Sequence, residues 1–149
     1  MKPPEAVETA KRSGDFASLL EQIPYLQFLG VRLEVRDGRR VAVMPFQEHL
    51  VGNPTVPALH GGTLGALLET VAHLELLATL EHLHLPRTIT LTIDYLRSGK
   101  TRETYASAKV VKAGRRVTTL QCHAWQEDES APIAMAMVIL KVSGAARTG

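Results

Sequence analysis

The chain has 149 residues, the size of one ordinary domain. Hydrophobic residues make up 45% of it and charged residues 21%, which excludes a disordered tail or a coiled-coil rod. No apolar run approaches the roughly 18–20 residues of a membrane span, and the polar start lacks the apolar core of a signal peptide. A net charge of +2 is too small to indicate a nucleic-acid partner. We therefore expect a cytoplasmic protein with neither nucleic-acid nor membrane partners.

The beginning of the chain predicts a loose segment followed by a short helix. Residues 1–14 are polar and include Pro3-Pro4, so we expect a loose lead-in outside the domain. Asp15 is a suitable N-cap for a helix over residues 15–23, which Pro24 is expected to end. The domain itself is expected to cover residues 15–143, followed by a tail at 144–149.

The next segment predicts a β-hairpin and then a loop. Residues 31–35 alternate apolar and charged side chains with the period of two that is typical of a strand. Asp37-Gly38 is a two-residue turn signal, so residues 41–44 are expected to return as the partner strand. Residues 47–59 contain several Gly, Asn and Pro breakers and predict a loop.

One long helix is predicted, from His60 to about His82. Leucine and valine recur there at three- and four-residue steps, and Pro86 blocks any extension. Four strand patterns follow with no second helix, over residues 88–95, 104–112, 117–126 and 133–142.

This order of elements predicts an α+β fold. In residues 88–95 the apolar side chains fall on odd positions, and residues 133–142 are almost wholly apolar, as expected of a strand covered on both faces. A helix with a wide apolar stripe needs a sheet to bury it. The simplest arrangement is a long central helix wrapped by a curved antiparallel sheet, which is a hotdog-like architecture.

The glycine pair Gly61-Gly62 at the start of the long helix is the first candidate for a site. Glycine costs about 1 kcal/mol relative to alanine in a helix, so two in succession need a reason. They can let the backbone pass close to the sheet. They can also leave N–H groups of the first turn open to negative charge, including an oxyanion that develops in a transition state. The two interpretations are compatible.

Glu69 is the second candidate. Its helical neighbours Gly65, Ala66 and Ala72 are small, which leaves room for a ligand. Partial removal of a carboxylate from water favours a role as base or nucleophile. The alternative is that Glu69 lies on the solvent face or pairs with His73 one turn later.

Other chemistry has little support in the sequence. The chain has no Gly-x-Ser-x-Gly elbow, no P-loop and no Gly-x-Gly-x-x-Gly motif, which argues against serine hydrolases, nucleotide hydrolases and dinucleotide-dependent enzymes. Its six histidines show no zinc-binding spacing, so we expect no metal. The single cysteine, Cys122, cannot form an internal disulfide and is expected to pack in the core. Arg115-Arg116 beside a glycine indicate a solvated turn or a grip on phosphates.

One signature combines three parts of the sequence: Asn53, the helix start His60-Gly61-Gly62, and Glu69 nine residues after the histidine. It resembles the active-site signature of hotdog-fold acyl-CoA thioesterases of the PaaI-like, phenylacetic acid degradation-related group. Tyr95-Leu96-Arg97 also looks like that family's Tyr-Leu-Arg. The resemblance spans roughly residues 15–142.

The resemblance implies a catalytic role for five residues. The backbone N–H of Gly62 would polarise the thioester carbonyl. Glu69 would be the catalytic acid and would act across a subunit interface. Asn53 and His60 would orient the nucleophile or the thioester, and Thr88 would position a water molecule. Many members carry Asp in place of Glu69, and the longer acid can attack the carbonyl directly where Asp would activate water.

Substrate contacts are expected from two further groups. Gly61 and Gly65 are small residues of the helix that would line the site. Basic residues near turns and strand ends would meet the phosphates of coenzyme A, and these are Arg97, Lys100, Arg115 and Arg116.

These observations predict an acyl-CoA thioesterase, in which water cleaves the thioester to a free acid and coenzyme A without any cofactor. We expect a homodimer or homotetramer, because a unit of one helix and one sheet leaves edge strands unpaired. The alternatives are a non-catalytic acyl-CoA-binding or regulatory hotdog domain, and a hotdog hydratase or dehydratase. The sequence does not specify which acyl group is used, nor whether the thioester is formed with coenzyme A or with a carrier protein.

Overall fold

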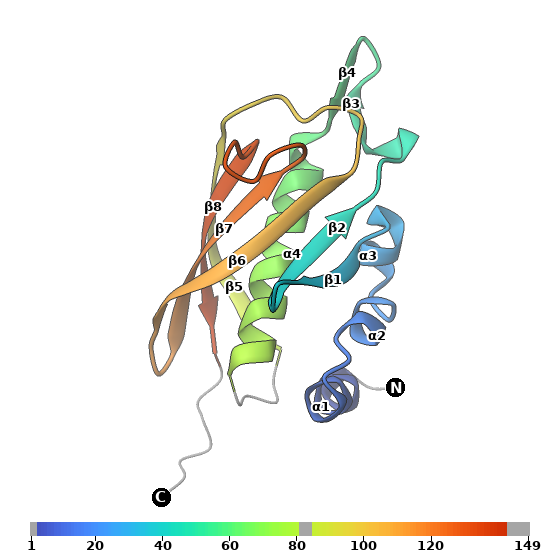
Figure 1. Ribbon diagram of the computed structural model, residues 1–149. Coiled ribbons are helices and arrows are strands. Elements are labelled where there is room, and N and C mark those ends of the chain that lie inside the picture. Colours follow the sequence, from blue (N-terminus) through green and yellow to red (C-terminus); the bar gives the residue numbers. More distant parts are fainter. Residues whose placement is uncertain (1–2, 81–84, 143–149) are drawn as a thin grey trace, which may run out of the picture.

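A computed structural model describes residues 3–80 and 85–142 and shows one long helix held in a curved sheet (Figure 1). The helix is α4 (Gly61–Thr79). The strands of the main sheet are β1 (Arg32–Arg36), β2 (Arg39–Met44), β5 (Arg87–Tyr95), β6 (Thr104–Ala113), β7 (Val117–Trp125) and β8 (Ala134–Lys141). They pair antiparallel in the order β1-β2-β6-β7-β8-β5. The predicted α+β hotdog architecture is confirmed, while the predicted helix end at His82 and the tail at 144–149 lie outside the described residues.

The polar start of the chain is a helix, α1 (Pro3–Ser13), so the expectation of a loose lead-in is wrong. Ala6, Val7 and Ala10 are at most 5% exposed and belong to the main hydrophobic core. Their spacing puts them on one face of a helix, and packing of that face stabilises the segment despite its polar composition.

Two short helices follow, α2 (Ala17–Leu20) and α3 (Pro24–Leu29). The N-cap position of α2 is Phe16 rather than the predicted Asp15, although Asp15 accepts a hydrogen bond from the Ser18 N–H at 3.1 Å in the first turn. Pro24 begins α3 rather than merely ending the helix before it, because proline at a first helical position lacks only an N–H that has no helical partner there.

The predicted hairpin is confirmed. Arg36 pairs with Arg39 across the turn, and Asp37 and Gly38 have φ values of 50° and 75°. Positive φ at both central residues is the geometry of the turn that matches the twist of a β-hairpin.

The expected loop at residues 47–59 is partly wrong. It contains a short 3-10 helix, η1 (Glu48–Leu50), and a separate two-stranded hairpin of β3 (Val51–Asn53) and β4 (Val56–Leu59). The side chain of Asn53 organises the turn, because its Oδ1 accepts hydrogen bonds from the Thr55 N–H at 2.9 Å and the Thr55 hydroxyl at 2.8 Å.

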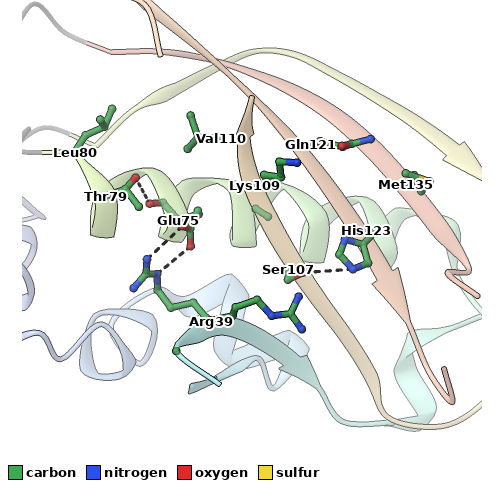
Figure 2. A pocket seen from close by; sticks show the side chains of 13 residues that line it. Arg39, Glu75, Thr79, Leu80, Ser107, Lys109, Val110, Gln121, His123 and Met135 are labelled. Carbon is green, nitrogen blue, oxygen red and sulfur yellow. Dashed lines mark hydrogen bonds and ion pairs between the residues drawn. The ribbon is translucent and has the colours of Figure 1, made fainter. Parts of the chain in front are cut away.

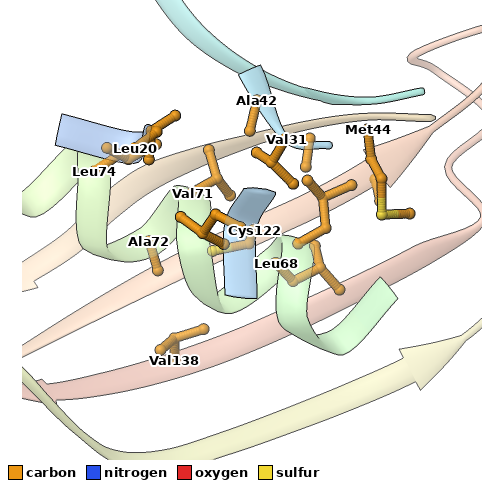
Figure 3. Close-up of a cluster of buried hydrophobic side chains, with 14 of the residues drawn as sticks. Leu20, Val31, Ala42, Met44, Leu68, Val71, Ala72, Leu74, Cys122 and Val138 are labelled. Carbon is orange, nitrogen blue, oxygen red and sulfur yellow. The ribbon is translucent and has the colours of Figure 1, made fainter. Parts of the chain in front are cut away.

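The core lies between α4 and the inner face of the sheet (Figure 3). Leu68 and Val71 of α4 pack there with Cys122 of β7 and Val138 of β8, all fully buried. Burial raises the pKa of the Cys122 thiol to about 12, so this cysteine is an inert core residue, as expected. None of the described helices is long and apolar enough to cross a bilayer.

The outer face of β8 differs from expectation. Ala136 and Val138 point to the core, but Met137 between them is 40% exposed. The prediction that this strand is covered on both faces is therefore wrong within the described chain, where the helix covers one face only.

Candidate active site

A bulge in β5 turns Thr88 toward α4. Thr88 pairs with Leu140 of β8 and Thr90 pairs with Ile139, so Ile89 is an extra residue in the ladder. Regular alternation would have turned Ile89 inward, but Ile89 is 54% exposed, and the hydroxyl of Thr88 reaches the helix instead. The apolar residues at the odd positions of β5 therefore do not all face inward, and Ile89 is the exception at this bulge. Bulges commonly redirect a side chain next to an active site.

Thr88 joins two residues of α4 in one hydrogen-bonded chain. Its Oγ1 donates to Glu69 Oε1 at 2.5 Å, and His73 Nε2 lies 3.0 Å from the same Oγ1. Because the hydroxyl proton is given to the carboxylate, the hydroxyl oxygen accepts from His73, which requires the tautomer with a proton on Nε2. Burial lowers the pKa of His73, against a smaller opposing effect of the Glu69 charge, and favours the neutral ring.

Glu69 and His73 face a cavity of about 180 Å³ between α2, α3 and α4. Its other walls are mainly leucines, among them Leu19, Leu26 and Leu77. Glu69 is half-buried, and its carboxylate therefore stands at the boundary between a polar network and an apolar space. This arrangement suits a substrate with a polar reacting group and an apolar tail.

The start of α4 forms a second group of candidate residues. His60 caps the helix, and its Nδ1 accepts a hydrogen bond from the Gly62 N–H at 2.8 Å. The Tyr95 hydroxyl donates to the Gly61 carbonyl at 2.9 Å. A Cβ on Gly61 would lie 3.2 Å from the Tyr95 ring, so the prediction that the backbone passes close to the sheet here is confirmed. The N–H of Gly62, predicted to be open to negative charge, is bonded to His60 in the single chain.

Gly65 is packed against the sheet in the single chain, and its expected contact with substrate stays a prediction. This glycine is buried, and a Cβ there would lie 2.9 Å from Cδ1 of Ile93 on β5. Its small size is explained by the close approach of the strand to the helix.

The single chain separates the expected catalytic residues into two groups. Glu69 and Thr88 lie together, whereas His60 and Gly62 lie at the helix start and Asn53 lies in the turn of the β3–β4 hairpin. Gly62 and Glu69 are seven helical steps apart, a rise of about 10 Å. One carbonyl group cannot touch both residues of the same chain.

The expected phosphate-binding cations also lie apart. Arg115 and Arg116 are exposed in the turn between β6 and β7. Arg97 follows β5 at the opposite end of the sheet and donates to the Pro132 carbonyl at 2.6 Å. Lys100 at that end lies 3.8 Å from a carboxylate oxygen of Glu127. A single chain therefore does not gather them around one nucleotide.

A larger cavity, of about 600 Å³, lies beside β2 and β6 and contains none of the expected site residues (Figure 2). On its α4 side, Glu75 is held by Arg40, with Nε and Oε2 3.0 Å apart. On its outer side, His123 Nε2 lies 3.5 Å from the Ser107 hydroxyl and 3.0 Å from Glu129 Oε1. Both contacts use the same ring nitrogen, so no proton relay through the imidazole exists and the three residues are not a catalytic triad.

Charge pairing accounts for the polar groups of this second cavity. The guanidinium of Arg39 forms two hydrogen bonds with Glu129 and lowers the pKa of that carboxyl to about 2. Within the described ranges, no three His, Cys, Asp or Glu side chains converge where a metal ion could bind. The strongest chemical candidate is therefore the group around Glu69.

Sequence reasoning missed the position of His73 in this group. It considered a direct pair between Glu69 and His73, but the two residues are bridged by Thr88. The four-residue spacing of Glu69 and His73 on one helix face was the available signal. The bulge that completes the bridge has no signal in the alternating sequence of β5.

Comparison with known proteins identifies the family. Residues 52–141, more than half of the chain, match a family model described as the acyl-CoA thioesterase N-terminal domain. The chain belongs to this acyl-CoA thioesterase family.

Relatives of this thioesterase chain agree with the assignment. It is 28% identical over 122 residues to the medium/long-chain acyl-CoA thioesterase YigI of Salmonella typhimurium, covering 72% of this chain and 78% of YigI. A solved Chromobacterium violaceum protein is 28% identical with a TM-score of 0.76, covering 93% of this chain and 97% of that one. A putative thioesterase from Ralstonia eutropha, phenylacetic acid degradation-related, shares the fold at 24% identity and a TM-score of 0.72, covering 85% and 98% of the two chains.

Proposed function

We propose that this protein hydrolyses acyl-CoA thioesters to a free acid and coenzyme A, with Glu69 as the base or nucleophile. The observation that carries the proposal is the Glu69 carboxylate, which accepts a hydrogen bond from Thr88 and faces an apolar cavity. A thioester presents a reactive carbonyl at the head of an apolar chain, and this site has matching polar and apolar parts. The name of the relative YigI specifies medium- and long-chain acyl-CoA, which makes that class the first to assay.

The active unit is proposed to contain two chains, as a homodimer or within a homotetramer. One thioester cannot touch both Glu69 and Gly62 of one chain, because about 10 Å of helix separates them. β5 offers the means to join two chains, since it lies at the edge of the sheet and, among the described strands, pairs with β8 alone. An unpaired edge strand of this length is a template for a second strand.

Antiparallel pairing of β5 with its copy about a two-fold axis would unite the two groups. In such a pair, the Thr88 end of one strand lies beside the Tyr95 end of the other. Glu69 of one chain, bonded to Thr88, would then approach Gly61 and Gly62 of the partner chain, where Tyr95 contacts the helix start. The same symmetry would bring Arg97 of one chain toward the Arg115-Arg116 end of the other.

In this arrangement the Gly62 N–H would polarise the thioester carbonyl and stabilise the oxyanion. His60 is proposed to turn its ring away from Gly62 when substrate binds, and then to orient the thioester together with Asn53. The exposure of His60 supports such a rotation. Gly61 would allow the close approach of substrate, and Thr88 would fix the Glu69 carboxylate and the water that it activates.

The test is thiol release from a panel of acyl-CoA substrates, followed with a thiol-reactive dye. Glu69→Gln keeps the size of the side chain but removes its charge, and should lower kcat by about 10²- to 10⁴-fold. The matched control is Glu75→Gln on the same helix, which keeps a hydrogen-bonding partner for Arg40 and should hydrolyse at close to the parent rate. Binding without turnover in the parent protein, or full activity of a folded Glu69→Gln variant, would contradict the proposal.

A further inference from the structure

The cavity beside Glu69 has an apolar, buried floor. Leu19, Leu20 and Leu26 line it from α2 and α3, and Leu74 and Leu77 line it from α4. Each of these leucines is at most 6% exposed. The floor is therefore formed by packed side chains of one chain and does not require a second chain to exist.

The polar groups of the cavity are gathered at the Glu69 side. Glu69 and His73 are tied together through Thr88. Thr70, the other polar residue of the described lining, donates its hydroxyl to the Ala66 carbonyl one turn earlier at 2.7 Å, so it offers little to a ligand. The other lining residues that the structure describes are apolar.

The rim of the cavity is apolar and exposed. Ile23, Tyr25 and Leu85 line it and are 36%, 54% and 42% exposed. Exposed apolar side chains around a buried apolar floor form an entrance that an apolar group can occupy.

We propose that this cavity binds the acyl chain of the substrate, that the substrates are straight-chain acyl thioesters of medium length, and that Leu77 sets the length limit. This inference rests on the proposed thioesterase function. An apolar cavity of about 150 Å³ holds a benzene molecule, so a cavity of about 180 Å³ accommodates roughly six to eight carbons. Leu77 is the lining residue of α4 farthest from Glu69, about 12 Å along the helix, and its side chain, 4% exposed, belongs to the wall at that end.

The composition of the walls favours an alkyl chain over an aryl group. Aromatic rings gain stability from offset or edge-to-face contact with other rings. Among the described residues of the lining, Tyr25 at the exposed rim is the only aromatic side chain besides the His73 imidazole. Branched aliphatic walls instead fit the flexible surface of an alkyl chain.

The experiment measures kcat/KM for straight-chain acyl-CoA substrates from acetyl to palmitoyl, and for phenylacetyl-CoA. Burial of each methylene is worth about 0.8 kcal/mol, so kcat/KM should rise about fourfold per carbon up to about eight carbons and then level off. Phenylacetyl-CoA should be hydrolysed less efficiently than octanoyl-CoA.

Variants of the floor and the rim test the assignment of the cavity. Leu77→Phe should lower kcat/KM for octanoyl-CoA at least tenfold while leaving butyryl-CoA within about threefold. Ile23→Trp narrows the entrance from an exposed position, so it tests the same cavity without disturbing the core, and should also lower the octanoyl-to-butyryl ratio. Val111→Phe, an exposed position on β6 outside the cavity, is the matched control and should leave this ratio unchanged.

The outcomes separate this inference from the proposed function. Thiol release that is independent of chain length, an unchanged octanoyl-to-butyryl ratio in folded Leu77→Phe and Ile23→Trp, or a preference for phenylacetyl-CoA would overturn the inference and leave thioesterase activity standing. Release of no thiol from any substrate would overturn the proposed function and this inference with it.

Discussion

The hydroxyl of Thr88 on β5 donates a hydrogen bond of 2.5 Å to the carboxylate of Glu69 on α4. This contact exists because the bulge at Ile89 reverses the side of the strand on which Thr88 lies. The bulge therefore joins the edge strand of the sheet to the acid of the central helix, and it does so at the strand through which two chains are proposed to associate. The contribution of the Thr88 hydroxyl to activity can be measured separately from that of the Glu69 carboxylate.

Thr88→Val should lower kcat/KM about 10- to 100-fold, because a hydrogen bond to a charged group contributes about 1.5–3 kcal/mol. The substitution removes the hydroxyl while keeping the branched shape, which leaves Glu69 and His73 without their shared partner. Thr88→Ser keeps the hydroxyl and should remain within about threefold of the parent. Equal losses in both variants, measured with the same acyl-CoA, would show that the methyl group and not the hydroxyl matters.

His73 should make the folded state less stable in acid. Burial lowers its pKa in the native protein below the ordinary value of about 6.5. As the pH falls below that value, the unfolded chain binds a proton at His73 more readily than the native chain does, so the free energy of unfolding decreases. Above that pH both states are neutral at this residue and its contribution is constant.

The measurement for His73 is urea unfolding between pH 8 and pH 5, for the parent and for His73→Gln. Glutamine can still donate a hydrogen bond toward Thr88 but does not titrate in this range. The variant should lose less stability than the parent between these two pH values. An identical pH dependence in the two proteins would contradict the assigned role of burial.

The fold could be predicted from the sequence where one local signal determined the geometry. Asp37-Gly38 specified the hairpin because both residues adopt positive φ. The helical period located α4, which ends at Thr79, well before Pro86. The bulge at Ile89 could not be predicted, because its alternating sequence is compatible with a regular strand and the register is decided by pairing with β8.

The candidate site was predictable only where it depends on residues close together in the sequence. The likeness of the spacing between His60 and Glu69 to the family signature made both residues candidates, but spacing does not reveal what surrounds them. Gly65, for example, is packed against Ile93 in the single chain through a contact between segments far apart in sequence. The partner of the Gly62 N–H likewise depends on the rotamer of His60, which sequence does not specify.

Glu75→Ala should destabilise the protein by about 1–3 kcal/mol without a large change in kcat. Glu75 and Arg40 are 17% and 26% exposed at their side chains, so their ion pair is partly screened and intermediate between surface and buried cases. Loss of the carboxylate leaves Arg40 partly buried without this partner. The free energy of unfolding in urea and kcat for one acyl-CoA provide the two measurements, and a large loss of kcat in the folded variant would contradict a purely structural role.

The most demanding prediction concerns the edge of β5. The double substitution Thr90→Lys and Thr92→Lys adds two charges at exposed positions of this strand. In an antiparallel pair of β5 strands, these lysines would face like charges across the two-fold axis, and like charges directly opposite are destabilising. The expected product is a folded monomer by light scattering, with kcat/KM reduced at least 100-fold, because Glu69 loses access to the Gly62 N–H of another chain.

The matched control is Thr119→Lys with Gln121→Lys, which adds the same charges at alternate positions of β7, an inner strand of the sheet. It should keep both the association and the activity of the parent. Since neither β5 position lies in the proposed site, loss of activity together with loss of association would tie catalysis to the paired strands. A monomer of the β5 variant that retains full activity would show instead that one chain holds a complete site, and the separation of Glu69 from Gly62 along α4 would then require a different oxyanion donor.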